Sequence, residues 1–321
     1  MTTRIIGTGS AVPEQVVTNE DLAKFVDTSD EWIRTRTGIK ERRIASADSG
    51  TSDLAIQAAK KALKNAGVSA EELDIIILAT SSADCCFPSG ACEVQAAIGA
   101  NKAAAFDLSA ACSGFVYALN TVHGFIQAGI YQTGLVIGAD TLSKLIDWND
   151  RSTCVLFGDG AGAAVVRAEE TGILHMTMGA DGTRGKVLEC GGRTTGNCLT
   201  GKKPELGYMT MDGQEVFKFA VKTVPESIKR VVEESGTRME EIKYFILHQA
   251  NYRMFEAIAK RLKIPMEKFP TNLEWYGNTS GATIPILLDE LNREGKLQRG
   301  DKLVLAGFGA GLTWGTTLLE W

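Results

Sequence analysis

An internal repeat limits the possible folds of this chain more than any other feature of its sequence. The segment Ala70–Ala79 (AEELDIIILA) aligns with Met239–His248 (MEEIKYFILH), and the second copy follows the first by 169 residues, the difference between 70 and 239. Leu135–Ala139 (LVIGA) aligns with Val304–Phe308 (VLAGF) at the same offset. Solenoid repeats are far shorter, about 20–50 residues. The repeat therefore predicts two similar α/β halves packed around a pseudo-twofold axis.

The first copy of the repeat lies in a helix–strand unit. An amphipathic helix is predicted from Ser52 to Ala66, closed by Gly67. The apolar run at 74–79 then indicates a strand that is buried on both faces of a parallel sheet. Nearer the N-terminus, Thr18–Arg36 is predicted to form one helix with Thr18 as its cap.

The boundary between the halves is expected near residue 172, because the polar run Arg167–Gly172 indicates a surface turn. The two halves are thus expected to comprise residues 1–172 and 173–321. Residues 190–207 are rich in Gly, Thr and Lys, and we expect them to form a loop inserted in the second half.

The composition argues against several classes of function. Of the 321 residues, 44% are hydrophobic and 23% are charged, and a net charge of −5 without a basic tail gives no basis for binding nucleic acid. No apolar run reaches the roughly 18 residues of a membrane span, and the N-terminus shows no signal peptide, so a cytoplasmic protein is expected. Seven cysteines without a C-x-x-C pair argue against disulfides and against a zinc site, and no metal is expected.

Cys112 lies where a strand is predicted to turn into a buried helix. The apolar run Ala103–Leu108 indicates the strand, and Gly114–Ala128 indicates the helix. The free N–H groups and the dipole of a first helical turn favour an anion, so the pKa of the thiol is expected to fall below its free value of about 8.5. Cys112 is therefore a candidate nucleophile, although a free cysteine in an apolar run also suits inert packing.

The repeat also predicts partners for Cys112. His248 ends the buried strand of the second half, and Asn278 lies in a small-residue turn, Tyr276–Gly281, near the position equivalent to Cys112. A glycine-rich turn follows at 306–315, and its N–H groups suit an oxyanion. Because α/β sheets bind ligands at the carboxyl ends of their strands, we expect these groups to converge. Considered alone, His248 is also compatible with a structural histidine in the core, and Asn278 is compatible with an ordinary turn residue.

Two glycine-rich segments, Phe157–Ala163 and Gly307–Gly311 within the turn at 306–315, are each compatible with a tight turn or a phosphate loop. Neither matches the G-x-G-x-x-G or the G-x-x-x-x-G-K-[ST] pattern in its expected place. A nucleotide-binding protein or a noncatalytic α/β scaffold therefore stands as the alternative from another class of function. His123 and His175 lack a comparable setting and are expected to be structural.

At these residues the chain resembles the thiolase-fold condensing enzymes, and closely the β-ketoacyl-acyl-carrier-protein synthase III family. The resemblance extends over nearly the whole chain. Its most specific motifs are Asp30–Ile39, Ala110–Gly114, Phe157–Gly162, His248–Asn251, Gly277–Asn278 and Gly307–Gly311. It implies an α/β fold of two thiolase-like halves in αβαβα layers. A thiolase would carry a second cysteine within 306–315, and an elongating synthase a second histidine in place of Asn278; this chain has neither.

The resemblance implies a reaction and its partners. Decarboxylative Claisen condensation would join an acyl-CoA primer, in most cases acetyl-CoA, to malonyl-acyl-carrier-protein through an acyl-enzyme, as the initiating step of fatty acid biosynthesis. The products would be 3-oxoacyl-acyl-carrier-protein, CoA and CO2. The resemblance implies no cofactor beyond the coenzyme A thioester that serves as substrate, and it implies a homodimer. A related coenzyme A condensing enzyme of secondary metabolism is the alternative within the enzymes.

The resemblance also assigns roles to single residues. The catalytic set would be Cys112, His248 and Asn278, and the backbone amides of Cys112, Gly309 and Ala310 would form the oxyanion hole. Coenzyme A contacts are implied for Trp32, Arg36, Thr37, Arg151, Gln214 and Asn251. Carrier-protein docking is implied for Lys218, Arg253 and Lys260, with Lys222 as a further candidate, and Phe87 is implied to belong to the primer pocket. The chain departs from the family pattern at Cys85–Cys86, Gln214 and Ala310.

Overall fold

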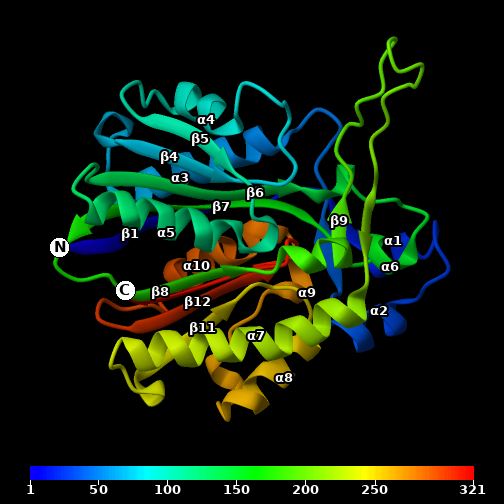
Figure 1. The fold of residues 1–321 in the computed structure, drawn as a ribbon. Coiled ribbons are helices and arrows are strands. Elements are labelled where there is room, and N and C mark those ends of the chain that lie inside the picture. Colours follow the sequence, from blue (N-terminus) through cyan, green and yellow to red (C-terminus); the bar gives the residue numbers. More distant parts are fainter.

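Two larger β-sheets form the framework of the molecule (Figure 1), which the computed structural model describes over residues 1–321. The strands of the first are β1 (Thr2–Ala11), β4 (Ile75–Ala79), β5 (Ala104–Leu108), β6 (Thr133–Thr141) and β7 (Asp159–Glu169). The strands of the second are β8 (Ile173–Ala180), β11 (Ile242–Leu247), β12 (Lys302–Gly309) and β13 (Thr313–Glu320). Their spatial orders are β1-β7-β6-β4-β5 and β11-β12-β13-β8.

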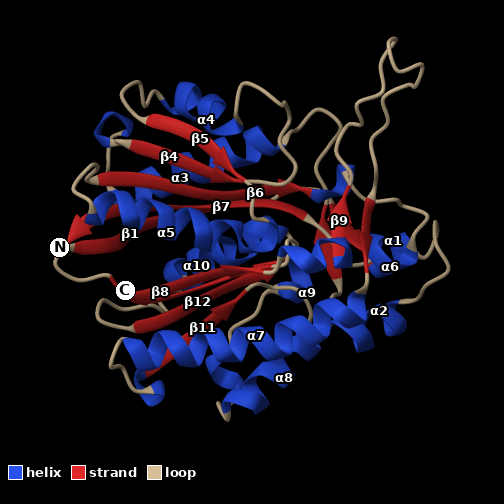
Figure 2. Ribbon diagram, in the orientation of Figure 1, coloured by secondary structure: helices blue, strands red, loops and turns tan.

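Helices fill the space between the two sheets and cover both outer faces (Figure 2). The central layer consists of α5 (Gly114–Gln127) and α10 (Thr283–Arg293). On the outer face of the first sheet lie α3 (Thr51–Ala66) and α4 (Gly90–Ile98). The outer face of the second is covered by α7 (Gly213–Glu234), against which α8 (Tyr252–Leu262) packs. The expected αβαβα layering is confirmed.

The two sheets follow one pattern, as the repeat predicted. β4 and β11 hold equivalent places, as do β6 and β12, β7 and β13, and β1 and β8. In the first sheet β4 and β6 are parallel, whereas β6–β7 and β7–β1 are antiparallel. In the second sheet β11 and β12 are likewise parallel, and β12–β13 and β13–β8 are antiparallel. β5 has no counterpart in the second sheet, so it forms an additional edge strand of the first. The first sheet ends in sequence at Glu169, and the second begins at Ile173.

Strand β4 is buried along its whole length, which accounts for its continuous apolar sequence. Helices α3 and α4 lie on one of its faces and α5 on the other. Phe115, Val116 and Leu119 of α5 are likewise inaccessible to solvent. A strand covered on both faces has no solvent-exposed side on which to place polar side chains, so the alternation of a half-exposed strand is absent.

The remaining elements are short. They are β2 (Val16–Thr18), β3 (Glu41–Arg43), β9 (Leu188–Cys190), β10 (Met209–Met211), α6 (Arg151–Cys154), α9 (Leu273–Tyr276) and the 3₁₀ turns η1 (Ala70–Glu72), η2 (Ala111–Ser113), η3 (Leu142–Lys144), η4 (Gly182–Val187), η5 (Met239–Glu241), η6 (Met266–Lys268) and η7 (Ser280–Ala282). β9 and β10 pair at the base of an arm, residues 188–211, whose tip projects from the molecule (Figure 1). The loop expected at 190–207 lies in this arm.

The prediction of a single helix over residues 18–36 is wrong. The chain instead forms α1 (Asn19–Leu22) and α2 (Asp30–Thr37). Thr18 caps the first of them as expected, but the Ser29 side chain accepts a hydrogen bond from the backbone N–H of Trp32 and starts the second. The Ser29 hydroxyl thus takes a backbone N–H that would otherwise donate to a carbonyl oxygen of a continuous helix, which is why serine is favoured at helix starts. No helix of the structure has both the length and the apolar composition needed to cross a membrane.

The glycine-rich segment Phe157–Ala163 is neither a tight turn nor a phosphate loop. Its residues from 159 onward belong to β7 and are buried. A Cβ atom on Gly162 would lie 2.7 Å from the backbone nitrogen of Ile286, and one on Gly158 would lie 2.3 Å from the carbonyl oxygen of Tyr276. The glycines therefore let β7 and the second half approach closely.

Candidate active site

Two equivalent turns meet where the halves come together. η2 leads into α5 and η7 leads into α10, and the two turns contact each other. Ala111 and Ser280 both have left-handed backbones, with φ of 46° and 53°, and lie 169 residues apart, the difference between 111 and 280. This conformation is strained for residues other than glycine, and such strain is concentrated at functional sites.

The repeat also shows which residue corresponds to Cys112. At the same offset, Cys112 aligns with Gly281, three residues beyond Asn278. The equivalence of Cys112 and Asn278 predicted from the sequence was therefore only approximate. Asn278 lies just before its turn, held by a bridge to Phe157.

Cys112, His248 and Asn278 line a single cavity of about 180 Å³. Cys112 also lines a second, mostly apolar cavity of about 370 Å³, together with Leu142, Leu145 and Met209. The thiol thus borders both cavities. The predicted convergence of a turn, a strand end and a second turn is therefore present in the structure.

Gly309 allows the backbone of the second sheet to approach the sulfur. A Cβ on Gly309 would lie 2.8 Å from the Cβ and 3.2 Å from the Sγ of Cys112, so no side chain fits there. Gly309 lines the smaller cavity with Cys112, and the next residue, Ala310, lines the larger. Besides the amide of Cys112 itself, the two other amides expected to form the oxyanion hole, those of Gly309 and Ala310, thus belong to residues that line the cavities beside the thiol.

His248 is buried at the end of β11, with 2% of its surface exposed. Its Nδ1 lies 2.7 Å from the hydroxyl of Thr283, and its ring packs edge-on against Phe308 at 5.2 Å between centroids. Burial lowers the pKa of His248 to about 3, so the imidazole is neutral at neutral pH. Because Nδ1 is engaged by Thr283, Nε2 is the ring nitrogen left for a ligand.

Asn278 is oriented by the backbone that follows it. Its Oδ1 accepts a hydrogen bond of 2.8 Å from the backbone N–H of Ser280. Its Nδ2 has no hydrogen-bond partner within the chain, and the residue lines the same cavity as His248. The carbonyl end of the amide is thus satisfied, and its N–H₂ end is free to donate.

The expected lowering of the Cys112 pKa is wrong. Burial raises the pKa of this thiol to about 12, and the charge of Asp140 adds to the rise. The Ser280 side chain and the backbone amide of Cys112 act in the opposite direction and lower the pKa, but by less. Cys112 is only 8% exposed, and removing a thiolate from water outweighs what a helix start offers. Acyl transfer from a protonated thiol needs a proton acceptor.

Comparison with known proteins agrees with this geometry. Residues 106–182 match the family profile described as 3-oxoacyl-[acyl-carrier-protein (ACP)] synthase III, and residues 232–321 match the profile of its C-terminal part. The β-ketoacyl-[acyl-carrier-protein] synthase III of Clostridium acetobutylicum is 54% identical over 99% of this chain and 98% of its own length. The crystal structure of 3-oxoacyl-[acyl-carrier-protein] synthase III from Aquifex aeolicus superimposes with a TM-score of 0.93 at 51% identity, covering 99% of this chain and 100% of that chain.

The chain belongs to the β-ketoacyl-acyl-carrier-protein synthase III family. It is accordingly an acyltransferase, a thiolase-fold condensing enzyme of fatty acid biosynthesis. The priming β-ketosynthase of the R1128 polyketide pathway shares the fold at 34% identity, with a TM-score of 0.92 over 99% of this chain and 96% of that chain. Family membership and the cavity at Cys112 come from independent observations, and both favour an enzyme over a scaffold or a nucleotide-binding protein.

Three of the residues expected to contact coenzyme A cluster on one surface. The guanidinium groups of Arg36 and Arg151 lie 4.5 Å and 4.9 Å from the ring centroid of Trp32. Asn251 lines the smaller cavity and donates from Nδ2 to the carbonyl oxygen of Arg36 at 3.1 Å. This surface therefore connects to the cavity of His248 through Asn251.

Thr37 and Gln214 have no contact that bears on their expected roles. The Thr37 hydroxyl donates to the carbonyl oxygen of Ile33 and accepts from the backbone N–H of Ile39, which ends α2. Gln214 lies in the first turn of α7, where its backbone N–H donates to Asp212. Their assignment to coenzyme A remains a prediction.

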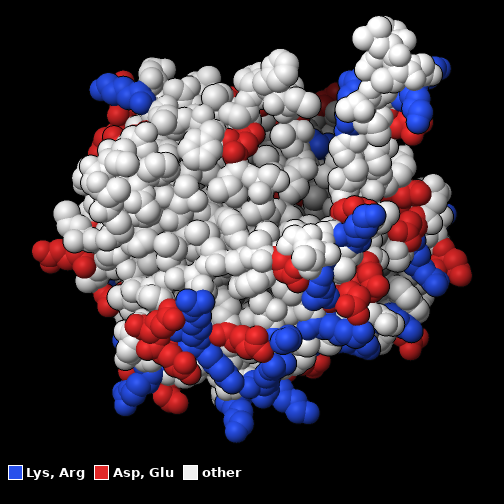
Figure 3. Space-filling view, in the orientation of Figure 1, with Lys and Arg blue, Asp and Glu red and all other residues white.

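The basic residues expected to dock a carrier protein lie on α7 and α8. Figure 3 shows Lys and Arg gathered over these two helices, with acidic residues between them. Lys218 is paired with Glu215 at 2.7 Å, and Arg253 donates to the carbonyl oxygen of Thr35 at 2.8 Å. Lys222 and Lys260 form no ion pair within the chain.

Phe87, expected in the primer pocket, is 86% exposed and lines neither cavity at Cys112. Within one chain the ring therefore does not contact the site. It lies in the segment before α4.

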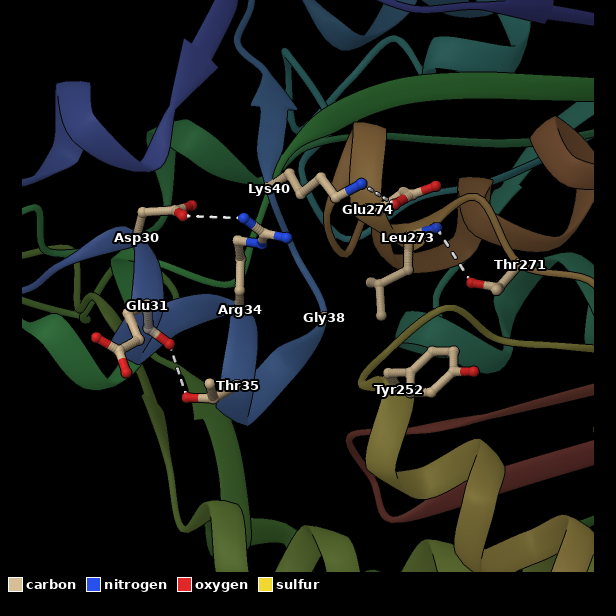
Figure 4. A pocket seen from close by; sticks show the side chains of 10 residues that line it. All are labelled: Asp30, Glu31, Arg34, Thr35, Gly38, Lys40, Tyr252, Thr271, Leu273 and Glu274. Carbon is tan, nitrogen blue, oxygen red and sulfur yellow. Dashed lines mark hydrogen bonds and ion pairs between the residues drawn. The ribbon is translucent and has the colours of Figure 1, made fainter.

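A separate open cavity of about 530 Å³ lies between α2 and the segment that leads into α9 (Figure 4). Four of its five charged side chains are paired, Arg34 with Asp30 at 3.2 Å and Lys40 with Glu274 at 2.6 Å, and Glu31 forms no ion pair. None of the three catalytic candidates lines it. Its ion pairs leave a single carboxylate, Glu31, without a charged partner, so we assign no chemistry to this cavity.

Sequence reasoning missed Thr283, Ser280 and Asp140. Thr283 contacts the His248 ring, Ser280 lines the larger cavity together with Cys112, and Asp140 is a buried carboxylate that accepts a hydrogen bond from the Gly281 N–H. The repeat held a signal for one of them, because Ser280 occupies the position of Ala111. Nothing in the local sequence around Asp140 indicates that its side chain reaches the turn of the other half.

Proposed function

We propose that the chain condenses an acyl-CoA primer, in the first place acetyl-CoA, with malonyl-acyl-carrier-protein through an acyl group on Cys112. The products are 3-oxoacyl-acyl-carrier-protein, coenzyme A and CO2, formed in the cytoplasm as the first carbon–carbon bond of fatty acid synthesis. The observation that carries the proposal is the shared cavity: a thiol, a neutral imidazole and a free amide line one space of about 180 Å³.

The first half-reaction is acyl transfer. The Cys112 sulfur attacks the thioester carbonyl, the bond from that carbon to the coenzyme A sulfur breaks, and one thioester replaces another at little thermodynamic cost. The negative oxygen of the tetrahedral intermediate needs donors, and the amides of Cys112, Gly309 and Ala310 are proposed to provide them. The closeness of Gly309 to the sulfur supports this role.

The second half-reaction is decarboxylation followed by condensation. Loss of CO2 from the malonyl group leaves a carbanion, so no strong base is needed, and the developing enolate oxygen requires hydrogen-bond donors. His248 Nε2–H and Asn278 Nδ2–H are proposed for this role, each worth about 3–4 kcal/mol by analogy with oxyanion holes. The Nε2–H tautomer requires the Thr283 hydroxyl to donate its proton to Nδ1, 2.7 Å away, in place of the Ser280 carbonyl oxygen, 3.0 Å away.

Substrate binding is proposed to use the surfaces beside this cavity. Arg36 and Arg151 beside Trp32 can hold the phosphates and the base of coenzyme A, since guanidinium groups pair with phosphates and stack on aromatic rings. The basic residues Lys218, Arg253 and Lys260 are proposed to dock the acidic carrier protein. Asn251 lies between the two surfaces and the cavity.

The primer is proposed to occupy the cavity of about 370 Å³, because most of its lining is apolar and Cys112 borders it. Phe87 can approach a primer pocket only if a second copy of the chain brings it there. We propose a homodimer formed along β5, an edge strand that leaves Phe106 partly exposed. Exposed edge strands pair readily with another strand.

A single experiment tests the proposed function. The protein is incubated with acetyl-CoA, the intact mass and the modified peptide are determined, and malonyl carrier protein is then added. We expect one acetyl group on Cys112, followed by its transfer into acetoacetyl carrier protein with release of CO2. Acetylation of another cysteine, or none, would refute the proposal.

The size of the larger cavity favours a second candidate, a condensing enzyme that takes longer primers for secondary metabolism. The cavity volume of about 370 Å³ exceeds what an acetyl group needs, and a polyketide priming β-ketosynthase shares the fold. Comparing kcat/KM for acetyl-, isobutyryl- and hexanoyl-CoA distinguishes the two. A preference for acetyl-CoA supports the first candidate, and a preference for hexanoyl-CoA supports the second.

A further inference from the structure

One arginine is buried in the core without a counter-charge. Arg42 lies in β3, is inaccessible to solvent and is among the largest fully buried side chains of the molecule. It forms no ion pair, because the neighbouring Glu41 pairs with Arg43 instead. Burial lowers the pKa of Arg42 only to about 10, so the guanidinium keeps its charge at neutral pH. Burying a charge without a partner of opposite sign is costly, so its presence here requires an explanation.

The guanidinium of Arg42 donates to carbonyl oxygens of two different segments. Its Nη1 donates to the Val17 carbonyl at 3.1 Å and its Nη2 to the Val155 carbonyl at 2.8 Å, whereas Nε has no partner. Val17 belongs to β2, the strand that pairs with β3. Val155 follows α6 and lies 113 residues beyond Arg42 in the chain. The bond to Val155 is therefore a tertiary contact, and it fixes the start of the segment 155–158.

Residues 155–158 bind the backbone of Asn278 on both sides. The Asn278 N–H donates to the Leu156 carbonyl oxygen at 2.9 Å, and the Gly158 N–H donates to the Asn278 carbonyl oxygen at 3.0 Å. These two bonds form the bridge between Phe157 and Asn278. Phe157 itself lines both cavities of the site. The position of Asn278 thus depends on where residues 155–158 lie.

Arg42 also packs against the backbone on either side of this bridge. A Cβ atom on Gly158 would lie 3.1 Å from the Cβ of Arg42, and one on Gly277 would lie 3.4 Å from it. Gly277 has a left-handed φ of 63°, and its Cβ would also lie 2.8 Å from the carbonyl oxygen of Leu156. The stem of Arg42 therefore lies against the two backbone segments that meet at Asn278.

We propose that Arg42 is a positioning residue for the decarboxylation step and acts through Asn278. Its guanidinium anchors the Val155 carbonyl, so residues 155–158 keep the register in which they bind the Asn278 backbone. The Asn278 side chain then holds its Oδ1 on the Ser280 N–H and leaves its Nδ2 free to donate. Hydrogen bonds from a charged donor are stronger than those from a neutral one, which explains the use of a buried arginine as the anchor. The inference rests on the proposed role of Asn278 as a donor to the enolate.

The test compares the two half-reactions in Arg42→Met, which keeps an apolar stem and removes the charge and both hydrogen bonds. Decarboxylation of malonyl carrier protein is expected to slow about tenfold, because a small misplacement of a catalytic group is enough for such a loss. Acetylation of Cys112 by acetyl-CoA is expected to change little. Arg42→Lys has one ammonium in place of the guanidinium fork, and its rate of decarboxylation is expected to fall between those of Arg42→Met and the wild type.

A double variant separates positioning from a general loss of structure. If Arg42 acts only through Asn278, Arg42→Met combined with Asn278→Ala decarboxylates no more slowly than Asn278→Ala alone. Effects that multiply overturn the proposal, as does a wild-type rate of decarboxylation in Arg42→Met or an equal loss of acetylation. If Arg42→Met does not fold, Arg42→Lys and its combination with Asn278→Ala decide by the same criteria.

Arg4→Met is the matched control. Arg4 also donates to a carbonyl oxygen, that of Trp321 at 2.9 Å, and also has a buried Nε without a partner, but it pairs with Glu169 and contacts no residue of the site. Both half-reactions are expected to keep their wild-type rates in this variant, and a selective loss of decarboxylation would overturn the proposal. A normal rate of decarboxylation in Asn278→Ala would instead refute the role of Asn278, and the inference with it; absence of acetyl-Cys112 in the wild type would refute the proposed function.

Discussion

The turns η2 and η7 have the same backbone geometry but opposite tasks. In the first half, Ala111 takes the left-handed conformation and the next residue, Cys112, presents its sulfur to two cavities. In the second half, Ser280 takes that conformation and Gly281 follows, so no side chain stands where the thiol stands in the first. Here the duplicated turn orients donors through its backbone instead of presenting a nucleophile.

The difference shows how a duplicated fold can divide a two-step reaction. The first half provides the group that carries the acyl chain. The second half holds His248 and Asn278 through Thr283 and the Ser280 amide. If this division is real, changes in one turn should affect one half-reaction and spare the other.

The largest effect is expected for Cys112→Ser. A serine hydroxyl is a weaker nucleophile than a thiol and loses its proton less readily, so acyl-enzyme formation should be lost while the fold and the decarboxylation of malonyl carrier protein survive. Mass spectrometry after acetyl-CoA and release of labelled CO2 measure the two steps. Loss of both would break the proposed division between the halves.

His248→Ala and Asn278→Ala test the opposite half. Each removes one donor to the enolate and is expected to slow decarboxylation about 10²–10³-fold, as the loss of an oxyanion-hole donor does. Acetylation of Cys112 should continue at a similar rate in both. Equal loss of acetylation and decarboxylation would instead mean that His248 activates the thiol.

Thr283→Val tests whether His248 is held by the second turn. The substitution keeps the shape and removes the hydroxyl that lies 2.7 Å from Nδ1. Loss of one buried hydrogen bond of about 1–1.5 kcal/mol should slow decarboxylation roughly tenfold. Thr283→Ser is the control, since it restores the hydroxyl and should restore most of the rate; a normal rate in Thr283→Val would show that Phe308 packing alone orients the ring.

Arg253→Glu tests the surface outside both turns. If docking of the acidic carrier protein is electrostatic, the change should raise the KM for malonyl carrier protein several-fold and flatten its salt dependence, because exposed charges are screened beyond about 8 Å at physiological ionic strength. Transfer from acetyl-CoA to Cys112 should change little. A KM that stays constant across the salt series in both proteins would exclude the basic surface on α8.

The smallest effect is expected from pH. The pKa of His248, lowered to about 3 by burial, implies that the imidazole stays neutral above that value, so the rate of decarboxylation should show no step near pH 6.5 that depends on His248. The folded pKa lies below the unfolded one, so the contribution of neutral His248 to stability is present above about pH 6.5 and is lost as the pH falls toward 3. An inflection near 6.5 that disappears in His248→Ala would show a solvated histidine.

The two halves and the location of the site could be derived from the sequence because these features are encoded locally and then repeated. Apolar runs set the buried strands, and one offset of 169 residues set their equivalence, which brought Cys112, His248 and the Asn278 turn to one place. The break between α1 and α2 was missed because the Ser29 cap competes with a helix pattern that looks continuous in the sequence.

Only the tertiary structure decided the state of the reactive groups. A helix start suggested a more acidic thiol, yet burial raises the pKa of Cys112 and lowers that of His248, because desolvation depends on atoms from β6, β12 and both turns rather than on neighbours in sequence. The hydrogen bond from the Gly281 N–H to Asp140 likewise joins residues from opposite halves. The sequence determined which groups the site contains; the packing of the two halves determined the pKa of the thiol and of the imidazole.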